Sequence, residues 1–225
     1  MIHPRRCLIL VLSALAAALP AHALSLRAAY EAAPARDGYD RDVVLEPGRV
    51  YTGGLLIGPS WDEDLTLFQD MELGLDVRIQ GNGAVLDMGG ESLTIAFCGK
   101  RLDVTDCVVV DGSVRFRGDV DPGRDRTPEG SVRHCTFYRP RDYAVRLQGV
   151  GEGVLLERNI VVDAVDSGPD GLIWTGILAE NLPTGLAFGL SVQAGFYGTP
   201  VVRENWTWFS DPAVNAEPLH HFGFL

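Results

Sequence analysis

Six positions recur at a nearly constant interval along the chain, and each follows the same short phrase. The intervals between them are 25, 28, 24, 22 and 24 residues. The recurring residues are Asn82, Cys107, Cys135, Asn159, Asn181 and Asn205. Three residues before each stands an aliphatic residue, namely Ile79, Val104, Val132, Leu156, Leu178 and Val202. A repeat of about 20 to 30 residues with aliphatic flanks is typical of a solenoid, whose rungs stack on one another.

One repeat contains three short strand signals separated by turn residues. Residues 154–157, 160–163 and 172–174 are rich in branched apolar residues, and Asn159 and the Gly-Pro-Asp-Gly turn at 168–171 separate them. Such segments are too short for helices, so the repeat favours β-strands. Strands that return in the same direction pair in parallel, about 4.8 Å apart. We therefore expect equivalent residues to stack.

The third strand supports this register independently. Residues 114–118, 145–149 and 172–176 align, with large apolar residues at the first and third positions. Side chains alternate across a strand, so these positions point inward and the second position points outward. We expect the aliphatic residues of the first strand, from Ile79 to Val202, to form one continuous inward row.

Over roughly residues 40–224, the chain resembles the right-handed parallel β-helix superfamily, which is also called pectin-lyase-like. Residues 43–51 are similar to the first-rung phrase of that family, and residues 77–87 to its second-rung phrase. The resemblance implies an all-β, right-handed parallel β-helix solenoid of about seven rungs with a short N-terminal cap. It also implies a ladder of corner Asn residues bonded to neighbouring backbone. The superfamily includes lyases, hydrolases, epimerases and proteins without known chemistry, so fold does not decide function.

The ends of the chain suggest three segments. Residues 1–23 read as a secretory signal peptide, because Arg5 and Arg6 precede an apolar run and Ala21-His22-Ala23 is a small-x-small cleavage site. Residues 24–41 are expected to form an N-terminal cap, with Leu26, Ala29, Tyr30 and Ala33 on one helical face. Residues 42–225 are expected to form the β-helix, with its C-terminal cap missing because the chain stops on an apolar phrase.

Charge and hydropathy exclude some classes of partner. The formal net charge is −11, so the chain is a poor ligand for nucleic acid. The apolar run of the signal is too short to span a membrane. We expect a secreted, periplasmic or cell-surface protein that does not cross the membrane.

The cysteines leave two alternatives open. Cys98, Cys107 and Cys135 remain after the signal, and none shows the spacing of a metal site. Cys107 and Cys135 occupy the same corner of adjacent repeats, so their Cα atoms fall inside the disulfide window. The alternatives are a disulfide, or two buried thiols that replace Asn as small apolar side chains.

The outward face of the third strand carries the candidate binding residues. Arg115 and Arg146 align as stacked neighbours, and Arg117 lies two residues further along. Like charges about 5 Å apart repel unless an anion lies between them. One interpretation is a binding site for the uronate or sulfate of an acidic polysaccharide. The other is that Asp119, Asp121 and Asp142 neutralise these arginines. In enzymes of the resembled superfamily, this face carries the substrate groove.

The segment around residue 120 gives a candidate metal site. Asp119, Asp121 and Asp125 surround a glycine at a spacing that could offer oxygen ligands to calcium. The resemblance makes calcium relevant, because uronate lyases of the superfamily commonly use it. A solvated loop is the alternative, since Arg124 and Arg126 dilute the negative charge.

Two classes of function therefore remain. The first is an exported protein that binds or processes an acidic polysaccharide, and an enzyme of this class would be a polysaccharide lyase or a glycoside hydrolase. The second is a non-catalytic surface, adhesion or spacer module. The catalytic phrases of the polygalacturonase and pectate lyase branches do not occur in the sequence, so no catalytic residue is assigned.

Overall fold

The computed structural model describes most of the chain between residues 23 and 222. The described residues are 23–58, 74–96, 100–118, 128–140, 143–148, 153–163, 177–179, 190–192, 200–208 and 221–222. These residues are predominantly β-structure and include one helix, α2 (Leu26–Ala32).

The strands form three separate sheets, here called the first, second and third sheet. The first sheet contains β2 (Arg41–Val44), β5 (Asp76–Gln80), β8 (Arg101–Thr105), β11 (Glu129–Arg133), β14 (Val154–Glu157) and β18 (Val201–Arg203). The second sheet contains β1 (Leu24–Ser25), β3 (Val50–Thr52), β6 (Val85–Asp87), β9 (Val108–Val110), β12 (Thr136–Tyr138), β15 (Ile160–Val162), β19 (Asn205–Trp208) and β20 (His221–Phe222). The third sheet contains β4 (Leu55–Ile57), β7 (Ser92–Ile95), β10 (Ser113–Arg117), β13 (Val145–Gln148), β16 (Ile177–Ala179) and β17 (Leu190–Val192).

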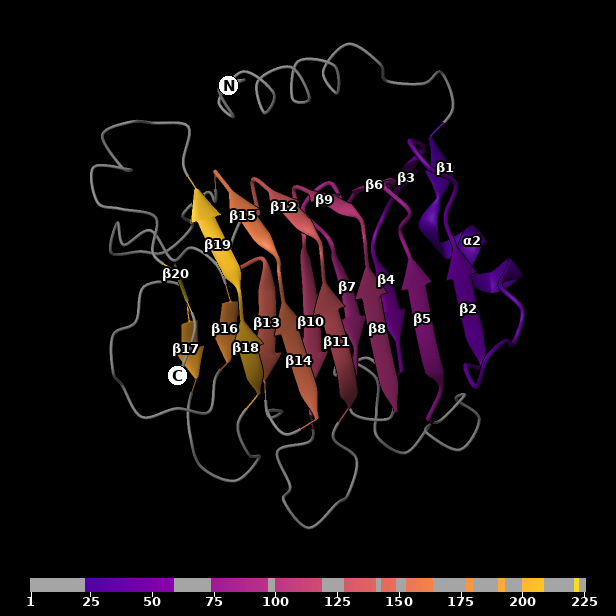
Figure 1. Ribbon diagram of the computed structural model, residues 1–225. Helices are drawn as coiled ribbons and strands as arrows, with labels where there is room; N and C mark the ends of the chain where they lie inside the picture. Colours follow the sequence, from indigo (N-terminus) through magenta and orange to yellow (C-terminus); the bar gives the residue numbers. More distant parts are fainter. Residues whose placement is uncertain are drawn as a thin grey trace, which may run out of the picture.

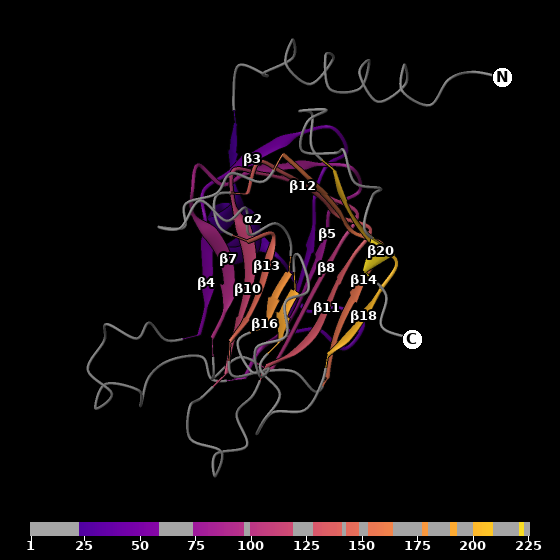
Figure 2. The same cartoon turned by 90° about the vertical axis from the view of Figure 1, so that its left-hand side faces the viewer.

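From β2 to β16 the chain visits the three sheets in turn, so each sheet takes every third strand. We call three consecutive strands, one in each sheet, a pass. Strands of successive passes pair in parallel, and only β20 pairs antiparallel, with β19, among the named strands. Figure 1 shows the strands of the first sheet side by side, and Figure 2 shows the three sheets around a common interior.

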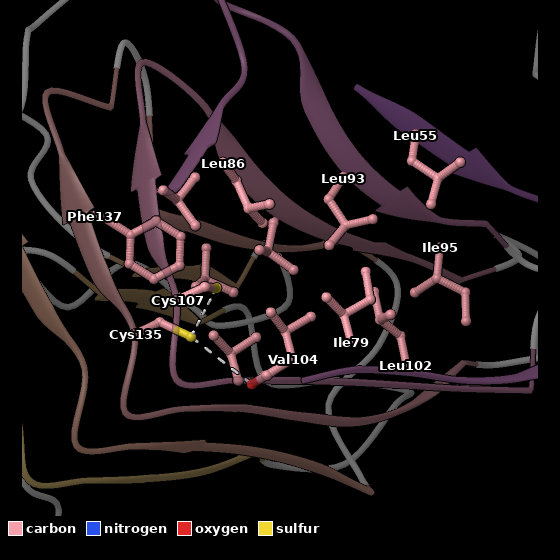
Figure 3. Packing of buried hydrophobic residues seen from close by; sticks show 14 of the residues in the cluster. Leu55, Ile79, Leu86, Leu93, Ile95, Leu102, Val104, Cys107, Cys135 and Phe137 are labelled. Carbon is pink, nitrogen blue, oxygen red and sulfur yellow. Dashed lines mark hydrogen bonds between the residues drawn. The ribbon is translucent and has the colours of Figure 1, made fainter. Parts of the chain in front are cut away.

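Inward side chains from all three sheets form one hydrophobic core. In the first sheet, the predicted inward row is confirmed for five of its six members and begins one pass earlier, at Val43. In the third sheet, Val114, Phe116, Val145 and Leu147 are fully buried, as the alternation of the strand predicts. Figure 3 shows these layers meeting, with Leu55, Leu93 and Ile95 of the third sheet near Ile79 and Leu102 of the first.

Each corner between the first and second sheets needs a residue with left-handed backbone. Asp106, His134, Arg158 and Glu204 have φ between 54° and 56° there. At these four corners the left-handed residue therefore lies one position before the recurring residue. Its N–H continues the backbone ladder, since His134 N–H donates to Glu157 O at 3.1 Å and Arg158 N–H to Arg203 O at 3.2 Å. At these two corners the chain therefore bends sharply while the N–H of the left-handed residue stays hydrogen-bonded.

The side chains at the recurring positions form the predicted ladder in the later passes. Asn159 Nδ2 donates to Val132 O at 2.9 Å, and its Oδ1 accepts from Cys135 N–H at 3.1 Å. Asn205 repeats this arrangement one pass later, donating to Leu156 O at 3.0 Å and accepting from Asn159 N–H at 3.0 Å. Both side chains are buried. Each amide therefore bridges two passes, as a group with both donor and acceptor can.

The position of Asn82 differs from the prediction. Gln80 pairs with Thr105, and Val85 pairs with Val108. The corner of the second pass therefore contains four residues, 81–84, whereas the same corner of the third pass contains only residues 106 and 107. Asn82 is consequently exposed and has left-handed backbone itself, with φ of 51°. Its side chain donates to Leu45 O at 3.1 Å, outside the buried ladder.

The position of Leu178 was also predicted wrongly. Leu156 pairs directly with Val202, so no strand lies between β14 and β18. Leu178 lies instead in the third sheet, beside Arg146. The spacing of 22 to 24 residues suggested two further repeats, whereas among the described strands only β18 follows β14 in the first sheet. Residues 172–174 and Asn181 lie outside the described residues.

The N-terminal helix packs against the end of the core. Ser25 caps it, with its Oγ accepting from Ala28 N–H at 3.2 Å. Leu26 and Ala33 are buried, and Ala29 and Tyr30 pack against the core cluster. The predicted apolar face is therefore correct, and it covers the interior beside the first strands.

We predict that Asn159→Ala lowers the free energy of unfolding by about 1 to 3 kcal/mol, because it removes the acceptor of the buried Cys135 N–H and a donor to Val132 O. Urea denaturation measures the loss. Thr136→Ala is the control, because it shortens an outward side chain on β12, the strand that follows Cys135. Equal small losses in the two variants would show that the amide does not support the corner.

We predict that Leu156→Ala costs roughly 2 to 5 kcal/mol, because the side chain is fully buried and its removal leaves a cavity. Leu155→Ala is the matched control, since Leu155 precedes it in the same strand and points outward. Urea denaturation measures both losses, and their ratio shows which face of β14 points into the core. A larger loss at Leu155 would reverse the assigned faces.

Candidate functional site

The candidate binding arginines lie on adjacent strands of the third sheet. Arg115 on β10 pairs in register with Arg146 on β13, and Arg117 pairs with Gln148. The register predicted from the third-strand phrase is therefore confirmed for these two strands. The flanking residues point into the core, so the arginines project from the outer face, where they are half-buried.

Local contacts orient two of these side chains. Arg115 Nε donates to Ser113 Oγ at 3.0 Å, which holds the side chain along its own strand. The Arg146 guanidinium lies over the Tyr143 ring, 5.9 Å from its centroid, as in a cation–π contact. Both arginines have further interactions within the protein. These contacts orient Arg115 and Arg146 on the outer face.

The row through these arginines is apolar or uncharged on either side. Before Arg115 stands Thr94, which is buried and within 2.9 Å of the Ser92 hydroxyl. After Arg146 stands Leu178, and not Ile173 as predicted, followed by Ser191. The positive charge in this row is therefore concentrated on β10 and β13.

The outer face of the first sheet has a different charge pattern. One row runs Asp42, Arg78, Asp103 and Ser131 through successive strands, so opposite charges alternate. Arg78 donates to both carboxylate oxygens of Asp42, at 2.8 and 2.9 Å. Opposite charges are therefore neighbours along this row, and Asp103 also pairs with Arg101 of its own strand. Adjacent arginines on the third sheet depart from that pattern.

The segment before β2 folds over this ionic row. Two guanidinium groups lie over the Tyr39 ring, with the carbon of Arg78 4.6 Å and that of Arg101 5.2 Å from the ring centroid. Its hydroxyl donates to Asp103 Oδ2 at 2.6 Å. Asp42 and Asp103 are each only 2% exposed. These contacts hold the N-terminal segment against the first sheet. We call the group formed by Tyr39, Asp42, Arg78, Arg101 and Asp103 the clasp.

The clasp shifts the ionisation of its members. Hydrogen bonds from Arg78 lower the pKa of Asp42, although burial acts in the opposite direction. Burial and the hydrogen bond to Asp103 raise the pKa of Tyr39. Asp42 therefore holds its negative charge, while Tyr39 stays protonated as a donor.

The clasp was not predicted from the sequence. Its signal was present in the alternation of Asp42, Arg78 and Asp103 at the same strand position in three repeats. Tyr39, however, belongs to a turn outside the repeat, so no periodicity places it over the sheet.

The residues of the predicted metal site lie outside the described part of the chain. Asp119, Asp121 and Asp125 all fall in residues 119–127. Within the part of the chain that is described, no group of three or more His, Cys, Asp or Glu side chains is placed to hold a metal ion. In that same part, no helix has the length and hydropathy needed to cross a bilayer.

Comparison with known proteins gives no family assignment. None of the protein-family models, curated proteins or solved structures compared with this chain matches it.

We predict that Asp42→Asn destabilises the chain by about 1 to 3 kcal/mol at neutral pH, because Arg78 loses a charged acceptor. The folded pKa of Asp42 lies below its ordinary value, so its stabilisation is complete above about pH 4 and is lost as pH falls through the folded pKa. Urea denaturation at several pH values should therefore show the gap to the parent protein closing in acid. Asp87→Asn, on the outer face of the second sheet, is the control. A gap independent of pH would contradict the ionic role.

Proposed function

We propose that the chain is an exported right-handed parallel β-helix that binds an acidic polysaccharide through Arg115, Arg117 and Arg146. The proposal is one of binding, and it assigns no catalytic residue. The observation that carries it is the in-register pair of arginines on the outer face of the third sheet.

The fold part of the proposal is supported by topology and packing. The strands enter three sheets in rotation and pair in parallel around one core. A parallel strand that returns to the same sheet through a crossover is almost always connected in the right-handed sense. Corner amides at Asn159 and Asn205 fit the ladder that the resemblance implies.

The binding part is supported by the local charge pattern. Adjacent strands lie about 4.8 Å apart, so a single carboxylate or sulfate could be approached by both Arg115 and Arg146. Guanidinium groups bind such anions through paired N–H donors. Since the chain carries a net charge of −11, overall electrostatics oppose a polyanion, and binding depends on this local patch.

A direct test is titration of the exported form with polygalacturonate, alginate and a neutral glucan. We expect binding to the two polyuronates only, weakening as salt is added, because the contact is partly exposed. The double variant Arg115→Gln with Arg146→Gln should lose more than about tenfold in affinity, since each charged hydrogen bond contributes about 1.5 to 3 kcal/mol.

Arg27→Gln combined with Arg133→Gln is the matched control, because it removes the same charge from the N-terminal helix and the first sheet. Its affinity should stay close to that of the parent protein. Equal loss in both double variants would mean that binding follows net charge. Equal binding of all three polymers, or of none, would favour the alternative function of a non-catalytic spacer or adhesion module.

A further inference from the structure

Two thiols occupy the ladder positions that precede Asn159. Cys107 and Cys135 stand at equivalent corners of adjacent passes, and their Sγ atoms are 3.5 Å apart. Both residues are buried, and both are free thiols. Figure 3 shows the two sulfurs directed toward each other beneath Phe137.

The backbone on both sides of the pair is held at strand spacing. Before the corner, Val104 pairs with Val132, and after it, Val108 pairs with Thr136. Thr136 N–H also donates to Cys107 O at 2.9 Å. Parallel neighbours lie about 4.8 Å apart, which falls inside the Cα separation of about 4.4 to 6.8 Å found in disulfides. The backbone spacing at this corner is therefore compatible with a disulfide.

The thiols contribute less to the ladder than the amides do. Cys135 Sγ contacts Arg133 O at 3.2 Å and Val104 O at 3.8 Å. A thiol is only a weak donor and a weak acceptor, whereas Asn159 and Asn205 bridge two passes with full hydrogen bonds. Giving up the thiol contacts therefore costs little.

We propose that Cys107 and Cys135 are an oxidisable pair, which a small-molecule disulfide converts into a covalent link between two adjacent passes. This inference does not depend on the proposed polysaccharide binding.

The reaction is a pair of thiol–disulfide exchanges. One cysteine thiolate attacks the disulfide of the oxidant, forming a mixed disulfide and releasing one thiol. The second cysteine then displaces the other half of the oxidant and forms the Cys107–Cys135 bond. Two S–H bonds and one S–S bond are lost, one S–S bond is gained within the protein, and the oxidant is reduced to two thiols.

Access to the pair makes the reaction slow. The hydrogen bond between the thiols and burial both raise the pKa of Cys107, so little thiolate is present at neutral pH. Gly81 closes one side, because a Cβ placed there would lie 2.4 Å from the Cβ of Cys107. The oxidant must therefore reach the pair when the corner opens, so the opening rate limits formation.

The link would close a loop that contains β10. Arg115 and Arg117 lie between Cys107 and Cys135 in the sequence, so oxidation fixes both ends of the segment that carries them. A closed loop reduces the entropy of the unfolded chain.

The test uses the full chain with Cys7→Ser and Cys98→Ser, which leaves only the proposed pair. The protein is equilibrated with oxidised and reduced dithiothreitol at varied ratios, quenched in acid and alkylated in denaturant. We expect loss of both alkylation sites, a mass lower by two hydrogens and a peptide map that joins residues 107 and 135. The urea midpoint of the oxidised form should exceed that of the reduced form.

Persistence of both alkylation sites at every ratio would overturn the proposal, as would a covalent dimer or a lower urea midpoint after oxidation. The parent chain provides a second test if the background variant does not fold. Its non-reduced peptide map should join residues 107 and 135, and a link from Cys98 to either residue would contradict the proposal.

Discussion

The structure depends on hydrogen bonding between successive passes at the corner between the first and second sheets. There the backbone turns through a left-handed residue, such as Arg158, whose N–H still donates to the next pass. The buried amides of Asn159 and Asn205 satisfy the remaining groups. An unsatisfied buried backbone group costs about 1 to 3 kcal/mol, so a repeated corner is stable only if each pass completes the one before it.

Much of the fold follows from the repeat, and its departures have local causes. The aliphatic row and the Arg115–Arg146 register were predictable because strand alternation and stacking are periodic. The position of Asn82 was predicted wrongly because its corner contains two more residues than the corner of the next pass. The position of Leu178 was predicted wrongly because the spacing of a repeat does not show which sheet a strand joins. The clasp at Tyr39 was not predictable, since it comes from a turn that does not repeat.

The outer faces of the first and third sheets use charge differently. On the first sheet, Asp42, Arg78 and Asp103 alternate in sign, and Tyr39 covers them, so the charges stabilise the protein's own N-terminal segment. On the third sheet, Arg115 and Arg146 stand side by side with the same sign. That contrast is the physical basis for proposing an external anion at the third sheet and an internal structural role for the first.

The central claim is that β18 and β19 stack directly on β14 and β15. Trp206 N–H donates to Asn159 O at 2.8 Å in this arrangement. The most direct measurement is a nuclear Overhauser experiment on labelled protein, read at the Trp206 amide. The account predicts contacts from that amide to the backbone protons of Asn159 and Ile160. Contacts to Asn181 and Leu182 instead would place another pass between them and contradict the register.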